Sequence, residues 1–157
     1  MNKLFYILIF CIVSNNIYTQ DVIIIDTAED ISEKEALVIL NGFGDSKKNR
    51  RIQKEFFQEK GYDLFIPEYV EKKSLDLTIS TFSSFYNKYK LDEYKQVKFL
   101  CYIIGGYVLN QHIEKEGKGK ITTIIYDRSP IQERAPKVAA QKLKFITKMY
   151  YGKVLFD

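Results

Sequence analysis

The sequence predicts an α/β fold, a three-layer sandwich in which helices cover both faces of a mainly parallel sheet. Short apolar runs rich in β-branched residues alternate with longer stretches whose apolar residues recur every three or four positions. Continuous apolar runs are typical of strands buried on both faces, as in a parallel sheet. Their alternation with helical patterns predicts successive βα units joined by right-handed crossovers.

Each element can be placed along the chain. The apolar runs of strand length lie at residues 22–25, 36–40, 63–66, 97–104, 121–126 and 154–156, and the fourth strand itself is expected to end at residue 102. The helical spacing is given, helix by helix, by Ile52, Phe56 and Phe57; by Leu77, Ile79, Phe82, Phe85 and Tyr86; by Tyr107, Val108, Gln111 and His112; and by Val138, Ala139, Leu143, Ile146 and Thr147. Glycines fall between these elements, as expected of turns.

Residues 1–19 differ from the rest and are predicted to be a signal peptide. Lys3 gives a positive start, and an uninterrupted apolar run follows at residues 4–13. That length suits a signal-peptide core of roughly 7 to 15 residues better than a spanning helix of roughly 20. Cleavage near Thr19 and Gln20 would give an exported protein, secreted or periplasmic, that touches a membrane only through an uncleaved leader. The alternative is an uncleaved first strand.

Residues 20–157 are predicted to form one domain, because this length supports one core and not two. Its basic and acidic side chains alternate, which is typical of a solvated surface and not of a nucleic-acid site. If Cys11 leaves with the leader, Cys101 remains alone, so neither an intramolecular disulfide nor a cysteine zinc site can form. The sequence has no metal-ligand spacing and no phosphate-binding glycine motif, so no metal and no cofactor is expected.

Ligands of a parallel sheet bind beyond the carboxyl ends of its strands. Four loops leave those ends, at residues 41–51, 67–76, 102–106 and 127–136. The candidate cleft residues on these loops are Asn41, Asp45, Ser46, Tyr102, Asp127, Arg128 and Ser129.

Three landmarks along residues 35–130 resemble the α/β-hydrolases, in particular small lipases and esterases. The first is the strand and loop ALVILNGFGDS, with Asn41 in place of the family's usual histidine and with Gly42 retained. The second is the window of the nucleophile elbow, Gly-x-Ser-x-Gly, which here consists of Cys101, Tyr102, Ile103, Ile104 and Gly105 and is followed by Gly106. The third is TTIIYDRSP at residues 122–130. The resemblance implies a truncated α/β-hydrolase-like fold, with an oxyanion-like pair of backbone N–H groups at Phe43 and Ile104.

The resemblance does not extend to the catalytic side chains. Ile103 stands where the family has serine, and it has no heteroatom that could attack a carbonyl. The single histidine, His112, lies on the helix after the elbow, where a partly exposed position is expected, and not on a loop after the last strand. Asp157 could occupy the place of the family's acid, but the family pattern beyond it is absent. The elbow is therefore expected to be degenerate and to hold no catalytic residue.

Other groups could still carry chemistry. Cys101 is expected to be a buried structural thiol, because it lies two residues before the apex of the elbow. The loop carboxylates could act as an acid and base pair, and the loop arginines could meet an anion or pair with those carboxylates. These residues are Asp45, Glu68, Asp127 and Glu133, with Arg128 and Arg134.

The sequence favours a non-catalytic hydrolase homologue, not a working enzyme, that binds an unknown small ligand or a protein partner. Two alternatives remain open. One is an active esterase-like hydrolase that uses the carboxylates or is completed by another chain. The other is an interaction module of an exported assembly, in which a partner covers the open sheet edge. Ile103 is expected to be buried, so its replacement by Ser is expected to leave hydrolysis at background and to cost about 2 to 4 kcal/mol of stability.

Overall fold

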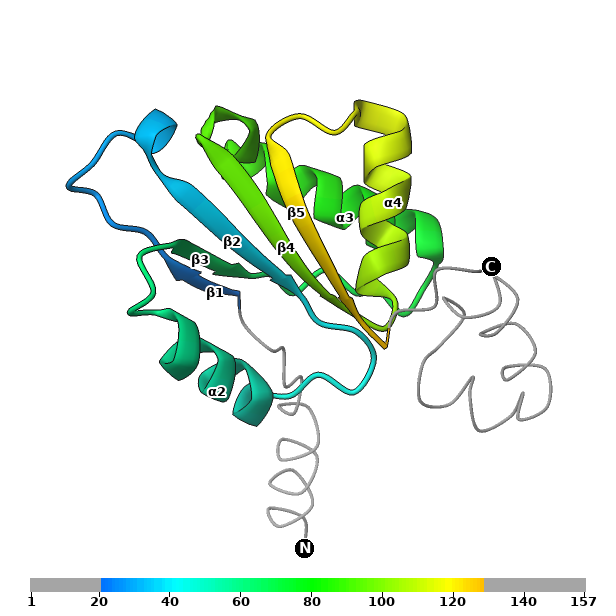
Figure 1. Cartoon of the computed structure of the whole chain (residues 1–157). Coiled ribbons are helices and arrows are strands. Elements are labelled where there is room, and N and C mark those ends of the chain that lie inside the picture. The colour runs from blue at the N-terminus through cyan, green and yellow to red at the C-terminus, as the bar shows by residue number, and fades with distance from the viewer. Residues whose placement is uncertain (1–20, 129–157) are drawn as a thin grey trace, which may run out of the picture.

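A five-stranded sheet organises the chain in a computed structural model that describes residues 21–128 (Figure 1). The strands are β1 (Val22–Ile24), β2 (Glu35–Leu40), β3 (Asp63–Ile66), β4 (Gln96–Tyr102) and β5 (Ile121–Asp127). Their order across the sheet is β1-β3-β2-β4-β5. The pairs β3–β2, β2–β4 and β4–β5 are parallel, and β1 alone pairs antiparallel to its neighbour β3. The predicted mainly parallel sheet is confirmed, with β4 in its interior and β5 directly beside it.

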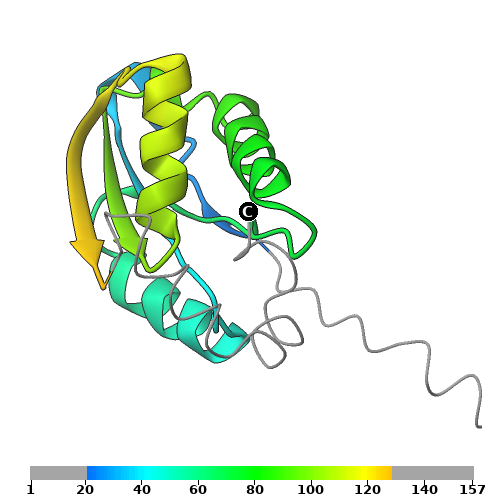
Figure 2. The ribbon, with the colours of Figure 1, turned by 90° about the vertical axis from the view of Figure 1, so that its right-hand side faces the viewer.

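Helices cover both faces of this sheet. The helices are α2 (Lys47–Phe57), α3 (Leu75–Lys88) and α4 (Gly105–Glu116), and short 3-10 turns occupy Ile31–Glu33 and Leu91–Glu93. Figure 2 shows α3 and α4 side by side over one face, and Figure 1 shows α2 apart from them. The larger core joins Val38 and Phe99 of the sheet to Phe82 of α3 and Val108 of α4. A smaller cluster on the other face includes Leu37 and Ile39, against which Phe57 of α2 packs.

The strands are held at their amino ends by a buried charge pair. Asp63 is buried and lies 2.6 Å from the ammonium group of Lys34. The hydroxyl of Tyr94 donates at 2.7 Å to the same carboxylate oxygen, Oδ2, that Lys34 contacts. Burying a carboxylate is costly unless such partners satisfy it. The pair therefore fixes the start of β3 against the segment that leads into β2.

The helical spacing located α2 correctly but did not identify its buried face. Ile52 and Phe56 are 50% and 61% exposed, and Phe57 is the aromatic residue that packs against the sheet. The buried residue of α2 is Arg50, 4% exposed. Its guanidinium group donates to the carbonyl oxygens of Ile66 and Pro67 at the end of β3. These polar contacts and Phe57 hold α2 with Ile52 and Phe56 turned outward.

His112 departs from its predicted environment. The ring is 2% exposed, so the expectation of a partly exposed helix position is wrong. It lies between α3 and α4, where its Nδ1 is 3.1 Å from the hydroxyl of Ser83. Its ring centroid is 5.2 Å from that of Phe82 and 4.5 Å from that of Tyr86. Helix packing buries it, because the residues of α3 that face α4 are aromatic.

Several expectations fall outside residues 21–128. They are the leader with its cleavage site, Ser129, Glu133 and Arg134, the helix expected around residues 138–147 and the strand expected at residues 154–156. Within the described range, no helix is both long and apolar enough to cross a membrane.

Candidate functional site

A sharp turn joins β4 to α4 at the carboxyl edge of the sheet. Ile103 lies at this turn with φ of 52°, in the left-handed region, and α4 begins at Gly105. A β-branched residue with positive φ is an outlier, and such a conformation costs about 1 to 3 kcal/mol. The N–H of Ile103 donates to the carbonyl oxygen of Asp127 at 3.3 Å, which ties the turn to the end of β5. The surroundings therefore hold Ile103 in a strained conformation that its own side chain disfavours.

Two glycines allow the neighbouring backbone to approach this turn. A Cβ atom on Gly42 would lie 2.7 Å from the Cβ of Ile103 and 2.8 Å from the carbonyl oxygen of Tyr102. A Cβ atom on Gly105 would lie 2.5 Å from the carbonyl oxygen of Leu40. Any larger residue would have to displace backbone at both positions. The loop after β2 is thereby packed directly on the turn after β4.

A cavity of about 380 Å³ opens beside Ile103. Its lining residues come from the loop after β2, from α2 and from the ends of β4 and β5. They are Asn41, Gly42, Phe43, Gly44, Asp45, Asn49, Ile52, Gln53, Tyr102, Ile103 and Arg128. We call this cavity the edge pocket. It has apolar surface from Ile52 and Ile103, and polar atoms from the side-chain amides of Asn41 and Gln53.

The edge pocket brings together some of the residues singled out from the sequence. Asn41, Asp45, Tyr102, Arg128 and Phe43 line it. The other candidates within residues 21–128 lie elsewhere. Ser46 caps α2, its hydroxyl accepting from the N–H of Asn49 at 3.2 Å. Asp127 is in contact with the guanidinium group of Arg128, so this arginine has the acidic partner considered from the sequence. Ile104 is 7% exposed and packs into the larger core.

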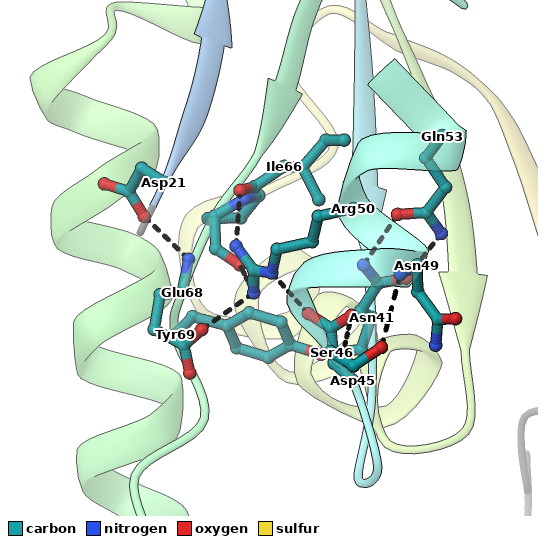
Figure 3. A network of polar contacts seen from close by, with 11 residues as sticks. Asp21, Asn41, Asp45, Ser46, Asn49, Arg50, Gln53, Ile66, Glu68 and Tyr69 are labelled. Atoms are coloured by element: carbon teal, nitrogen blue, oxygen red, sulfur yellow. Dashed lines mark hydrogen bonds and ion pairs between the residues drawn. The ribbon is translucent and has the colours of Figure 1, made fainter. Parts of the chain in front are cut away.

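A polar network behind the edge pocket centres on Arg50 (Figure 3). Its guanidinium group lies 2.5 Å from Asp45 and 2.8 Å from Glu68, in addition to its bonds to the carbonyl oxygens after β3. Asp45 also accepts from the N–H of Ser46 at 2.8 Å. The network links the loop after β2 to the loop after β3. It fixes the wall of the edge pocket that Asp45 provides.

Asn41 is held through both its side chain and its backbone carbonyl group. Its side-chain amide exchanges two hydrogen bonds of 2.8 Å with the amide of Gln53 on α2. The hydroxyl of Tyr69 donates to the carbonyl oxygen of Asn41 at 2.5 Å, and burial raises the pKa of Tyr69 well above its ordinary value. This phenol is therefore neutral and acts as a donor. Asn41 is therefore a rigid part of the pocket wall.

A second, smaller cavity of about 100 Å³ lies on the other side of the network. Asp45, Arg50, Glu68 and Lys72 are among its lining residues. Burial raises the pKa of Glu68, and the neighbouring Arg50 opposes that rise. Both carboxylates that contact Arg50 thus reach this cavity.

Within residues 21–128, the cysteine thiol and the imidazole lie away from the edge pocket. Cys101 is fully buried in the larger core, where burial raises the pKa of its thiol to about 12. The prediction of a structural thiol is confirmed by this burial. His112, the one histidine of the sequence, lies between α3 and α4 and lines neither cavity. Within residues 21–128, no group of three or more His, Cys, Asp or Glu residues is arranged to hold a metal ion.

Sequence reasoning missed several residues of this site. Arg50 and Arg51 are adjacent and chemically identical, yet Arg50 is buried in the network while Arg51 is exposed and lies 3.8 Å from Glu55. No sequence signal separates them. Gln53 and Tyr69 were also missed, because their partners are atoms of Asn41, on a different loop.

Comparisons with known proteins identify the fold. No family model matches the chain, and no curated protein matches it. Solved structures do. MenH from S. aureus is 18% identical, with a TM-score of 0.60 over 83% of this chain and 51% of its own. The report on the metagenome-derived lipolytic enzymes LipS and LipT describes a structure that is 12% identical. Its TM-score is 0.57, and the match covers 77% of this chain and 50% of that one. The esterase EaEST from Exiguobacterium antarcticum is 16% identical, with a TM-score of 0.56. The match covers 83% of this chain and 51% of the esterase.

These likenesses and the strand order define an α/β-hydrolase fold, as the sequence motifs predicted. The chain spans about half the length of these structures. The described residues thus form part of an α/β-hydrolase fold, in which the turn at Ile103 follows the strand β4 and precedes the helix α4.

Proposed function

We propose that this chain is a non-catalytic α/β-hydrolase homologue that binds a small ligand in the edge pocket. The observation that carries the proposal is the turn at Ile103, which keeps a strained backbone while presenting only hydrocarbon to the pocket. Strained positions in proteins gather at functional sites, because other interactions must maintain them. A turn maintained without a reactive atom is suited to binding and not to acyl transfer.

The chemistry of the surrounding side chains supports this proposal. Acyl transfer by a serine hydrolase needs a nucleophile, a base that takes its proton and an acid that orients the base. Ile103 has no proton to give, and the buried thiol of Cys101, with a pKa of about 12, stays protonated near neutral pH. The imidazole of His112 contacts Ser83 between two helices on the far side of β4 and does not reach the pocket.

The composition of the edge pocket suggests the class of ligand. Ile52, Phe43 and Ile103 offer apolar surface, and Asn41, Gln53 and Arg128 offer polar groups at its wall and rim. We propose that the N–H of Phe43, which lines the pocket, and the backbone N–H of Ile104, the residue after Ile103, serve a carbonyl or carboxylate oxygen, as the family resemblance implies. The ligand would then be a small molecule with an apolar chain and one such oxygen-bearing group.

Octanoate, which has both features, is the probe for this proposal. Titration of the isotope-labelled protein is expected to shift the amide resonances of Gly42, Phe43 and Gly44. Replacing Ile103 by Arg fills the pocket and is expected to weaken binding at least about tenfold, or about 1.4 kcal/mol. Leu77→Arg is the matched control, since Leu77 is an exposed apolar residue of α3. Unshifted amide resonances, or equal losses in both variants, would contradict ligand binding at this site.

An active hydrolase is the second candidate, and a specific observation favours it. Asp45 and Glu68 share Arg50 and line the smaller cavity, and the raised pKa of Glu68 favours its protonated form relative to an ordinary glutamate. Such a pair could provide a base and an acid. The assay is turnover of p-nitrophenyl butyrate, with labelling by a fluorophosphonate probe. Turnover that survives repurification and is lost in both Asp45→Asn and Glu68→Gln would replace the non-catalytic proposal.

Completion by another chain is a further form of that candidate. The chain spans about half the length of the hydrolase structures that it resembles. A second polypeptide could supply groups that the described residues lack. In that case ester hydrolysis appears only when the partner is added, and the isolated chain stays at background.

A further inference from the structure

The outward face of α2 combines exposed apolar side chains with an excess of positive charge. Ile52 and Phe56 lie one turn apart, are 50% and 61% exposed, and therefore project from the same face. Exposed basic residues on or just after α2 are Lys47, Lys48, Arg51, Lys54 and Lys60, and the exposed acidic ones are Glu55 and Glu59. Arg50, the remaining basic residue of the helix, is buried with its carboxylate partners.

Stability of the helix does not account for the lysines at its start. Lys47 and Lys48 lie in the first turn, which has no acidic residue. The N-terminus of a helix carries partial positive charge, so cations there are unfavourable and anions are favourable. Within residues 21–128, no ion pair involves Lys47, Lys48 or Lys54. The basic end of α2 thus opposes its own helix dipole.

We propose that this face of α2 docks on the surface of an anionic lipid bilayer. A helix that lies in a membrane interface buries aromatic or aliphatic side chains among the acyl chains while Lys and Arg meet anionic headgroups. Ile52 and Phe56 provide the first kind of contact, and the exposed basic residues provide the second. Gaining an anionic partner also relieves the unfavourable charge at the start of the helix.

Charge complementarity separates a bilayer from other occupants of this face. A second copy of the chain docked on α2 would bring like charges together, which is costly. A nucleic acid would neutralise the lysines but would leave the apolar pair without an apolar environment. A lipid surface satisfies both, because it is anionic at the headgroups and apolar beneath them.

Docking in this way would place the edge pocket at the bilayer surface. Ile52 belongs to both the docking face and the pocket lining, and Asn49 and Gln53 of the same helix also line the pocket. An apolar ligand could then pass between lipid and pocket. Docking itself does not depend on ligand binding, so the two proposals can fail separately.

The test is sedimentation of the intact chain with vesicles of phosphatidylcholine, with and without phosphatidylglycerol. Phe56→Gln removes the exposed ring, and Lys48→Gln with Lys54→Gln removes two charges. Leu77→Gln is the matched apolar control, and Lys118→Gln with Lys120→Gln is the matched charge control. All variants retain residues 1–20, so any vesicle binding by that segment is constant across the set.

We expect the paired lysine variant to lose roughly 25-fold in affinity for the anionic vesicles, about fivefold for each charge. Phe56→Gln should lose about fivefold, and both controls should change less than about twofold. Binding of the intact chain should weaken at about 1 M salt, where screening acts over about 3 Å.

Three results would overturn docking through α2. The first is equal binding to vesicles with and without phosphatidylglycerol, or unchanged binding in the α2 variants. The second is a dimer by light scattering that Phe56→Gln dissociates while vesicle binding stays the same, which would identify a second copy as the occupant. The third is tighter binding to an oligonucleotide that depends on Lys48 and Lys54 but not on Phe56. Octanoate binding measured without vesicles reports on the edge pocket separately.

Discussion

The two faces of the sheet are held by different physical means. On the face under α3 and α4, aromatic rings interlock: Phe82 is fully buried and contacts the rings of Tyr69, Tyr86, Phe99 and His112. On the other face, α2 is anchored by the guanidinium group of Arg50 and by Phe57, while Ile52 and Phe56 point outward. The first face is fixed by apolar burial and the second by directed polar contacts. Polar anchoring leaves the exposed side of α2 free to carry apolar and basic groups.

The largest expected effect separates the two faces directly. Replacing Phe82 by Ala should lower the free energy of unfolding by about 3 to 5 kcal/mol, because a large cavity is left among the rings. Phe56→Ala removes the same side chain from the exposed side of α2 and should change stability by less than about 0.5 kcal/mol. Urea unfolding of both variants measures the difference. Equal losses would mean that α2 is anchored by apolar burial after all.

The next effect concerns the polar anchor. Arg50→Met should cost about 2 to 3 kcal/mol, because it leaves Asp45 and Glu68 without their cation and the carbonyl oxygens after β3 without their donor. Arg51→Met, at the adjacent exposed position, should cost less than about 0.5 kcal/mol. Urea unfolding provides both values. Similar effects at the two positions would show that the buried network does not hold α2.

The turn at Ile103 should tolerate substitution better than a buried position does. Ile103 is 38% exposed and has positive φ, so the cost of about 2 to 4 kcal/mol expected for burial does not apply to Ile103→Ser. Ile103→Gly loses apolar contacts but removes the strain of the left-handed conformation, and its net change in unfolding free energy should be within about 1 kcal/mol. Thermal unfolding measures it. If Ile103→Gly lowered the free energy of unfolding as much as Phe82→Ala does, the inferred backbone strain at Ile103 would be contradicted.

The smallest expected effect is a pH dependence of the free energy of unfolding, which arises from His112 on the aromatic face. Burial lowers the pKa of His112 below its ordinary value of 6.5, so the folded state binds fewer protons there than the unfolded state does. The resulting stability is complete above the unfolded pKa and is lost as the pH falls below about 6.5 toward the folded pKa. His112→Phe should flatten this part of the curve of unfolding free energy against pH, whatever its effect on stability at neutral pH. An unchanged slope would assign the dependence to another group.

The strands and the family resemblance could be predicted because they depend on local patterns. Asp63–Ile66 has the predicted bounds, and the ends of β2, β4 and β5 lie within one or two residues of their predicted positions. The antiparallel pairing of β1 was not predicted, since an apolar run does not encode the direction of its neighbour. The window from Cys101 to Gly106 was found by its spacing, although the positive φ of Ile103 runs against the preference of that residue.

The sequence by itself determined which segments form the sheet, because apolar periodicity is a property of the residues alone. It also determined that Ile103 brings no nucleophile to the turn after β4, because this side chain has no heteroatom. Only the tertiary structure decided that Arg50 and not Arg51 is buried, that His112 lies among aromatic rings, and that Ile52 and Phe56 face outward. Each of these outcomes depends on partners distant in the chain, such as the carbonyl oxygens after β3 and the rings of α3. A local pattern limits which faces a helix could bury, and the contacts available across the fold select one of them.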